Sequence, residues 1–224
     1  MPDQEWVKVS DLTTNTASGS VIKLPLNNLP ICPNMSNPEF RASLLKLRDE
    51  SVRLIDIRIL ALCTLWSERS EKPRFKLWLG STDDDLRLEV LTNLYRLRSV
   101  MKALKPENII RNDPDSERVL ACVPANDGRD DGTAAHVCGP DTATHTIAIH
   151  EKFCTLPDMP RGTLDSKLLT LIHECTHFDD TFSAIDYERK YYGQFMAKRL
   201  ARENPKIAIR NADNISWYIC STGG

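Results

Sequence analysis

The stretch LLTLIHECTHFDD, residues 168–180, holds two histidines four positions apart, with a glutamate directly after the first. At about 100° per helical residue, His177 lies about 40° and Glu174 about 100° from His173. The apolar side chains fall on the other side of the same helix: Leu168, Leu171, Ile172 and Cys175. The polar groups form a face of their own, which favours a metal-binding helix over a buried structural helix with two ordinary histidines.

Two histidines at this spacing have a defined metal chemistry. Side chains at positions i and i+4 of a helix present one ring nitrogen each to a single Zn²⁺. Glu174 lies too far around the helix to be an equal ligand, but its carboxylate reaches a water molecule at the metal and acts as a general base. The HExxH pattern of His173, Glu174 and His177 is therefore typical of zinc hydrolases.

A catalytic zinc site needs a third protein ligand and one open position. Asp179 and Asp180 follow His177 immediately, so their side chains point away or lie too far along the chain. Asp186 lies nine residues beyond His177, which leaves enough chain to turn back to the metal. A later helix offers Glu203 as the alternative. The residues alone leave both acids open and predict one zinc ion per chain.

Helical periodicity dominates the chain before this motif. Leucine and isoleucine recur at helical spacing between about residues 39 and 68. A second helix is predicted to begin with Ser81 as its N-cap and to end before Pro106. Its apolar stripe has intervals of three and four residues: Leu86, Val90, Leu94, Leu97, Met101 and Leu104. This spacing predicts an amphipathic helix that packs against the core.

A shorter part of the chain predicts β-structure. RVLACV (118–123) and THTIAIHEKF (144–153) hold β-branched, alternating residues with turn residues between them. After Thr163 the pattern is helical to the C-terminus, with breaks near Ser183 and at Pro205. The prediction is an α+β fold, mainly helical, with a small sheet or hairpin.

The length of 224 residues suits one domain with an added arm. Residues 1–40 contain five prolines and show no lasting period, so we predict an extended N-terminal arm. Residues 41–224 are predicted to form a single domain that contains the histidine helix.

Composition excludes several function classes. A net charge of −2 and a pI near 6.2 give no basic surface for nucleic acid. No run approaches the roughly 18–20 apolar residues that span a bilayer. The first residues lack the basic and apolar regions of a Sec signal peptide, so we expect a cytoplasmic location or export by another route.

Cysteine and the remaining histidines add little by spacing alone. The chain has seven cysteines and no CxxC pair, which leaves the redox compartment open. Cys175 falls on the apolar face of the histidine helix, where a buried, inert thiol is expected. His136, His145 and His150 have no metal-binding spacing to one another, so surface or hairpin positions are expected.

Further segments resemble the aspzincins, the family of deuterolysin and peptidyl-Lys metalloendopeptidase. RFKLWLG (74–80) resembles the family's Arg-Tyr-x-x-Trp-Phe-Gly segment, and GTLDSKLLTLIHE (162–174) its run into the zinc helix. NPKIAIRNADNISWYI (204–219) resembles its closing Asn-Ala-Asp helix. The resemblance covers roughly residues 70 to 220 and implies a zincin-like metalloprotease domain.

The resemblance implies a role for each matching residue. His173, His177 and Asp186 would bind zinc, with Asp186 at the position of the family's third ligand. Glu174 would activate the attacking water. A tyrosine ahead of the family's glycine would stabilise the oxyanion, and Tyr192, just before Gly193, is our choice.

Three departures from the family pattern bear on these roles. The family's Gly-Thr before the ligand aspartate is Ser183-Ala184 here. The segment from Asp186 to Gly193 is three residues longer than in the family, which keeps Tyr187 and Tyr191 as alternatives to Tyr192. Both features lie between the second histidine and the closing helix.

The third departure concerns the acidic S1′ pocket of lysine-specific members, which use the Asn-Ala-Asp carboxylate and a glutamate three residues later. Here Asp213 is present, but the second position is Ser216. Asp213 therefore binds substrate, or instead caps a helix or holds the zinc loop by a hydrogen bond. The family also implies a disulfide near the sheet, for which Cys122 and Cys154 are the candidates.

Together these features predict a zinc-dependent endopeptidase that acts on a protein or peptide substrate and prefers a basic residue at P1′. The alternatives are a catalytically silent module that binds a protein partner, and a delivered toxin or cell-wall peptide hydrolase using the same site. An inhibitor or immunity protein is a candidate partner in the toxin case.

Overall fold

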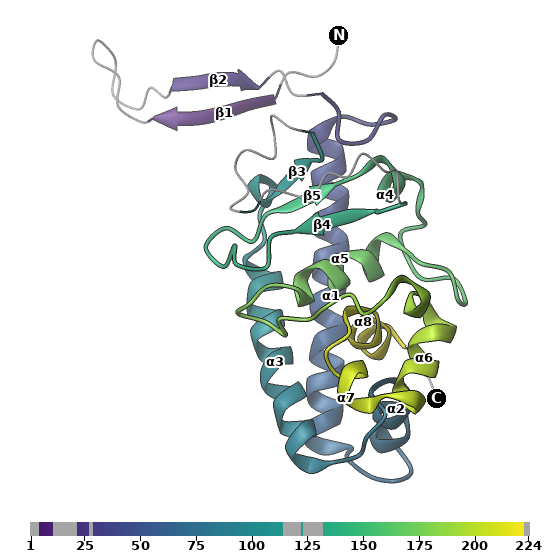
Figure 1. Cartoon of the computed structure of the whole chain (residues 1–224). Helices are drawn as coiled ribbons and strands as arrows, with labels where there is room; N and C mark the ends of the chain where they lie inside the picture. The colour runs from purple at the N-terminus through teal and green to yellow at the C-terminus, as the bar shows by residue number, and fades with distance from the viewer. Residues whose placement is uncertain (1–4, 11–21, 27–28, 114–121, 123–131, 222–224) are drawn as a thin grey trace.

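The computed structural model describes residues 5–10, 22–26, 29–113, 122 and 132–221. Two long helices, α1 (Asn37–Thr64) and α3 (Asp84–Ala103), run side by side along the molecule (Figure 1). Ser36 and Glu39 form a capping box that begins α1. The domain is α+β and mainly helical, as predicted.

Helix α3 confirms the predicted stripe but not the predicted cap. Val90, Leu94, Leu97 and Met101 are buried along the face of α3 that meets the core. The N-cap is Asp83, whose carboxylate accepts the Leu86 N–H at 2.9 Å. The prediction of Ser81 was wrong, because the Ser81 hydroxyl accepts the Asp83 N–H and starts the turn before the helix.

A small sheet lies at one end of the two long helices (Figure 1). Its strand order is β3 (Ile109–Arg111), β5 (Ile147–Ile149) and β4 (Ala135–Val137). Strand β5 pairs in parallel with β3 and antiparallel with β4, so β4 is an edge strand. The predicted strand in 144–153 is confirmed, whereas RVLACV lies outside the described residues except for Cys122, which is not in a strand.

Among the remaining helices, those at 167–176 and 212–220 pack against α1, and the others pack mainly against these two or against one another. They are α2 (Glu71–Leu79), α4 (Glu151–Thr155), α5 (Lys167–Thr176), α6 (Gln194–Glu203), α7 (Pro205–Ala208) and α8 (Ala212–Cys220), with short 3₁₀ turns η1 (Pro106–Asn108) and η3 (Arg189–Tyr191). Helix α5 lies between α1 and α8 at the centre of the molecule. Among the described residues, no helix is long and apolar enough to span a membrane.

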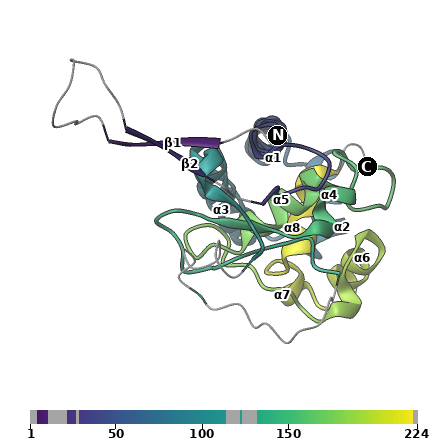
Figure 2. The same cartoon turned by 90° about the horizontal axis from the view of Figure 1, so that it is seen from above.

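The N-terminal region begins with an antiparallel hairpin of β1 (Glu5–Ser10) and β2 (Ile22–Leu26), which stands beyond the end of α1 in Figures 1 and 2. Ile31 is buried in the core and α1 begins at Asn37, before the predicted boundary at residue 40. This part of the predicted arm is therefore packed into the domain.

Two disulfides lie near the sheet. They join Cys32 to Cys154 and Cys122 to Cys138, so the predicted Cys122–Cys154 pairing was wrong. Cys154 instead pairs with the segment before α1, which approaches α4 from the far end of the sequence. Cys175 is buried as expected, and burial raises the pKa of its thiol.

A buried ionic network joins α1, α2 and α8. Arg58 and Glu71 are 3% and 2% exposed, with Arg58 Nη1 3.4 Å from the Glu71 carboxylate. The Tyr218 hydroxyl donates to Glu71 at 2.8 Å, and Arg58 Nη2 donates to the Ser221 carbonyl at 2.8 Å. Glu71 thus accepts from two different helices.

Replacing Glu71 by alanine is expected to lower the free energy of unfolding by about 3–5 kcal/mol, because it leaves the Arg58 charge buried without its partner. Urea denaturation followed by circular dichroism measures the change. The matched control is Glu68→Ala, since Glu68 is exposed and its ion pair with Lys72 lies at the surface, and a loss below about 1 kcal/mol is expected there. Equal losses for the two variants would contradict the role of the network.

Candidate active site

Helix α5 is fixed in the core by its apolar side and by its cap. The Ser166 hydroxyl accepts the Leu169 N–H at 3.1 Å and begins the helix. Leu168, Ile172 and Cys175 are fully buried on the opposite side from the motif. The first histidine is therefore carried on a rigid element rather than on a loop.

The chain after α5 turns back toward the helix. His177 is the C-cap of α5, and the Thr176 carbonyl accepts the Ala184 N–H at 3.0 Å. Ser183 adopts a left-handed φ of 47°, at the position where the resembling family carries glycine. The turn therefore forms here without the glycine and returns the next acid to the helix.

The N-terminus of α8 anchors the segment that carries Asp186. The Ile185 N–H donates to the Arg210 carbonyl at 2.8 Å, and the Ile185 carbonyl accepts the Ala212 N–H at 3.0 Å. The Asn211 side chain accepts the Tyr187 N–H at 3.0 Å. Both neighbours of Asp186 are thus held by backbone and side-chain bonds.

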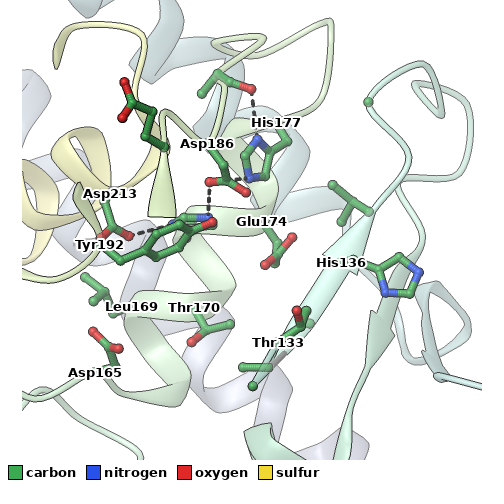
Figure 3. A pocket seen from close by; sticks show the side chains of 18 residues that line it. Thr133, His136, Asp165, Leu169, Thr170, Glu174, His177, Asp186, Tyr192 and Asp213 are labelled. Atoms are coloured by element: carbon green, nitrogen blue, oxygen red, sulfur yellow. Dashed lines mark hydrogen bonds and ion pairs between the residues drawn. The ribbon is translucent and has the colours of Figure 1, made fainter. Parts of the chain in front are cut away.

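The structure brings His173, His177 and Asp186 together, and Figure 3 shows His177 beside Asp186. His173 Nε2 lies 3.0 Å and His177 Nε2 3.5 Å from Asp186 Oδ1, and one ligand atom from each residue lies within 4.8 Å of the others. Two donors at about 2.0–2.1 Å from a tetrahedral zinc lie about 3.3 Å apart. The spacing of the three donor atoms therefore fits a zinc ion.

The hydrogen bonds of the other ring nitrogens fix both tautomers. His173 Nδ1–H donates to Asp213 Oδ1 at 2.9 Å, and His177 Nδ1–H donates to the Ala184 carbonyl at 2.8 Å. Each ring consequently turns its Nε2 atom toward the common centre. This arrangement is the one that metal-bound histidines use to set their orientation.

The charges around the centre favour a cation. Burial would lower the pKa of His173, but hydrogen bonds to Asp186 and Asp213 raise it well above its usual value. Burial opposes the ionisation of Asp186, yet its bond to His173 and the charges of both histidines lower its pKa to about 2. Positive charge is therefore stabilised where the three donor atoms meet.

Glu174 points into the cavity beside this centre (Figure 3). Its side chain is 7% exposed and, within the described ranges, forms no hydrogen bond or ion pair. Burial raises the pKa of Glu174 to about 8, and the charges of Asp186 and Asp213 add to the effect of burial. A carboxylate with a raised proton affinity, facing an open cavity, is suited to accept a proton from water.

The three candidate tyrosines occupy different places. Tyr192 lines the cavity, stacks on His173 with ring centroids 6.0 Å apart and forms a side-chain hydrogen bond with Asp186. Tyr187 and Tyr191 stack on each other instead, and the Tyr191 hydroxyl donates to Glu203. Of the three, Tyr192 alone lines the described cavity.

Glu203, the alternative third ligand, lies beside Tyr191, a member of the stacked Tyr187–Tyr191 pair. It accepts from Arg199 at 2.7 Å and from Tyr191 at 3.2 Å, both away from the histidines. Asp180 pairs with His145 at 3.0 Å and is likewise turned from the centre. Asp186 is therefore the acid that the structure places beside both histidines.

The cavity itself has a volume of about 960 Å³ and lies between α5 and the edge strand β4. Its walls include Asp165, which sequence reasoning did not single out, and His136, which was expected only at a surface or hairpin position. His136 Nδ1 lies 2.8 Å from His150 Nε2, and His150 Nδ1 accepts from the Asn112 amide at 2.8 Å. The antiparallel pairing of β4 with β5 brings these hydrogen-bonded side chains together. Only knowledge of the β4–β5 register could therefore have predicted the contact between His136 and His150.

This combination of a helix bearing HExxH, an acid returned from the following loop and an edge strand beside the cavity is the arrangement of a zincin-like fold. The family model for aspzincins of group M35, described as lysine-specific metallo-endopeptidase, matches residues 64–220. The chain belongs to the aspzincin family, whose metalloendopeptidases are zinc-dependent.

Curated relatives and a solved structure agree with this assignment. The chain is 48% identical over 54 residues to the peptidyl-Lys metalloendopeptidase of Armillaria mellea and 41% identical over 59 residues to that of Grifola frondosa. These matches cover 24% and 26% of this chain but only 14% and 16% of those relatives. The zinc peptidase from Grifola frondosa has the same fold, with a TM-score of 0.59 and 23% identity over 81% of this chain and 94% of that chain.

Proposed function

We propose that this chain is a zinc-dependent endopeptidase that holds its metal with His173, His177 and Asp186. The observation that carries the proposal is the convergence of two Nε2 atoms and one carboxylate oxygen within 4.8 Å, with both imidazole tautomers fixed. The Nδ1 hydrogen bonds leave each ring only one nitrogen for a metal, and both of these nitrogens face the same point.

The chain's own groups divide the chemistry of peptide hydrolysis among them. When bound, zinc polarises the scissile carbonyl and lowers the pKa of water. Glu174 takes a proton from the attacking water and gives it to the leaving amine. The Tyr192 hydroxyl donates to the oxygen on which negative charge develops. Asp213 keeps His173 in the tautomer that binds metal.

The names of the curated relatives support a preference for lysine, because each of them is a peptidyl-Lys metalloendopeptidase. The acidic wall of the cavity formed by Asp165 and Asp213 agrees with a basic residue at P1′. We propose this preference for the present chain as the finer part of its function.

Incubation of the full chain with a denatured protein mixture tests the proposal. Cleavage is expected with zinc, and it is expected to stop with a chelator and return when zinc is restored. Mass spectrometry of the fragments identifies the residue on the C-terminal side of each cut, where lysine is expected. Absence of cleavage by a zinc-loaded, folded protein would contradict the proposal and favour the protein-binding alternative.

Replacing Tyr192 by phenylalanine is expected to lower kcat by about 10²-fold, because one donor to the developing oxyanion is lost. KM is expected to change little. Tyr187→Phe is the matched control, since Tyr187 stacks on Tyr191 rather than on the cavity residue His173, and should keep near-normal kcat. Steady-state kinetics with one fluorogenic peptide measures both, and an equal loss in the two variants would contradict the choice of Tyr192.

A further inference from the structure

Recognition of a basic substrate side chain in the cavity would require an acid that can accept its hydrogen bonds. Both oxygens of the Asp213 carboxylate are already hydrogen-bonded within the protein. Its Oδ1 accepts from His173 Nδ1, and its Oδ2 accepts from the Gly193 N–H. The Asp213 side chain is only 10% exposed. Both carboxylate oxygens therefore serve the protein, one for a metal-binding histidine and one for the backbone that follows Tyr192.

Helix α8 offers no second acid to replace it. Ser216 lies one turn after Asp213 on the same helix. It is fully buried, and its hydroxyl donates to the Ala212 carbonyl at 2.7 Å. The α8 side of the cavity therefore contributes no uncommitted carboxylate.

Asp165, which precedes the N-cap of α5, is an acid of the cavity wall on the substrate-binding side of Glu174. It lines the cavity, and Figure 3 shows it on the same side as Asp213, with Leu169 between them. Among the residues that the structure describes, its carboxylate forms no hydrogen bond and no ion pair, and its side chain is exposed to solvent. Asp165 therefore has the full capacity of an ionised carboxylate for a ligand.

The surroundings of Asp165 favour an incoming cation. Partial desolvation by the cavity wall raises the pKa of Asp165, and the negative charge of Asp213 adds to this rise, although His173 and Lys152 oppose it. A substrate cation placed between Asp165 and Asp213 would relieve the repulsion between these two carboxylates. Leu169, which lies between the two acids in Figure 3, offers an apolar surface for the aliphatic stem of a long basic side chain.

The same cavity has an independent mark of a ligand site. Glu174 is more than nine-tenths buried, points into the cavity and has no hydrogen-bond partner within the described residues. A buried carboxylate without a partner is costly unless a ligand or water completes it. Asp165 thus lines a cavity that has the features of a ligand-binding site.

We propose that Asp165 is the residue that selects a basic side chain in this cavity, by accepting charge-assisted hydrogen bonds from the ammonium group of a substrate lysine, while Asp213 positions His173. This inference rests on the proposed peptidase function and names the group that recognises its substrate. Asp165 acts on specificity and takes no part in bond cleavage.

Paired peptides test the selection by Asp165. One peptide has lysine at P1′ and the other norleucine, which keeps the carbon stem and lacks the ammonium group. For Asp165→Asn, kcat/KM is expected to fall about ten- to hundredfold with lysine, the usual value of a charged hydrogen bond, and to stay within about threefold with norleucine. The matched control is Asp158→Asn, which removes the same charge from an exposed acid paired with Lys167.

Two kinetic outcomes would overturn the assignment. Equal losses with lysine and norleucine would show that Asp165 supports the fold or the catalysis rather than specificity. A selective loss with Asp213→Asn but not with Asp165→Asn would move recognition to α8. Asp213→Asn is instead expected to lower the rates with both peptides alike and to weaken zinc binding.

A binding measurement separates this inference from the proposed function. In the zinc-loaded Glu174→Gln protein, calorimetry is expected to show tighter binding of the lysine peptide than of the norleucine peptide. Adding Asp165→Asn is expected to remove most of that difference. If the wild type cleaves no peptide but this difference is found, the peptidase proposal fails and the recognition by Asp165 stands. If the lysine and norleucine peptides bind equally, the inference about Asp165 is wrong.

Discussion

Replacing Glu174 by glutamine is expected to lower kcat by about 10²–10⁴-fold while the protein keeps one zinc ion per chain. The amide has nearly the same shape as the carboxylate but cannot accept a proton from water or pass one to the leaving amine. Since Glu174 bonds to no other described residue, the fold loses no internal contact. Single-turnover kinetics with a fluorogenic peptide and zinc analysis by mass spectrometry provide the two readouts.

Glu203→Gln is the matched control, because Glu203 is exposed and pairs with Arg199 away from the cavity. Its activity should be unchanged. If Glu174→Gln kept wild-type activity, Glu174 would not be the general base. If that variant lost zinc, its lowered activity would report on metal binding instead of proton transfer.

Replacing Asp186 by alanine is expected to weaken zinc binding by at least about 100-fold, more than the loss of an outer hydrogen-bond partner. The variant removes one of the three converging donors, and the two histidines alone leave the coordination sphere incomplete. Competition with a fluorescent zinc chelator measures the affinity. Because zinc stabilises the state that binds it, the zinc-induced rise in Tm should shrink as well.

Asp180→Ala is the control for this second prediction. Asp180 lies in the same turn region after α5 but pairs with His145, so its loss should leave zinc affinity unchanged. Wild-type zinc affinity in Asp186→Ala would show that another group completes the sphere.

Much of this architecture could be predicted because it follows local periodicity. The α3 stripe and the face of α5 are patterns within one helix, and the structure contains both. The cap of α3 could not be chosen from sequence, since Ser81 and Asp83 are both good N-cap residues and the choice depends on where the preceding turn ends.

Disulfide and strand pairings between distant parts of the chain could not be predicted from such local patterns. Cys32 and Cys154 are 122 residues apart, and only the packing of the segment before α1 against α4 brings them together. Sequence alone does not determine the connectivity of cysteines. The parallel pairing of β3 with β5 is non-local in the same way.

The candidate site likewise has features that follow from local sequence spacing and features that depend on long-range contacts. The spacing from His177 to Asp186 predicted a return of the chain, and the structure contains this turn. The role of Asp213 remained open between substrate binding and a structural hydrogen bond, because its two partners, His173 and Gly193, lie 40 and 20 residues earlier in the chain. Asp165 carried no motif of its own, and only the three-dimensional wall of the cavity revealed it.

The N-terminal end of α8 touches both sides of the metal centre, holding the loop of Asp186 through Arg210, Asn211 and Ala212 and the first histidine through Asp213. One short helix thus fixes the positions of two metal-donor side chains, His173 and Asp186, that come from different parts of the chain. Because His173 belongs to α5 and is joined to α8 by its bond to Asp213, the distance between its imidazole and the Asp186 carboxylate depends on how α8 is placed against α5. Sliding of α8 against α5 is the movement that would separate the donors, and the dense apolar contact between these two helices resists it.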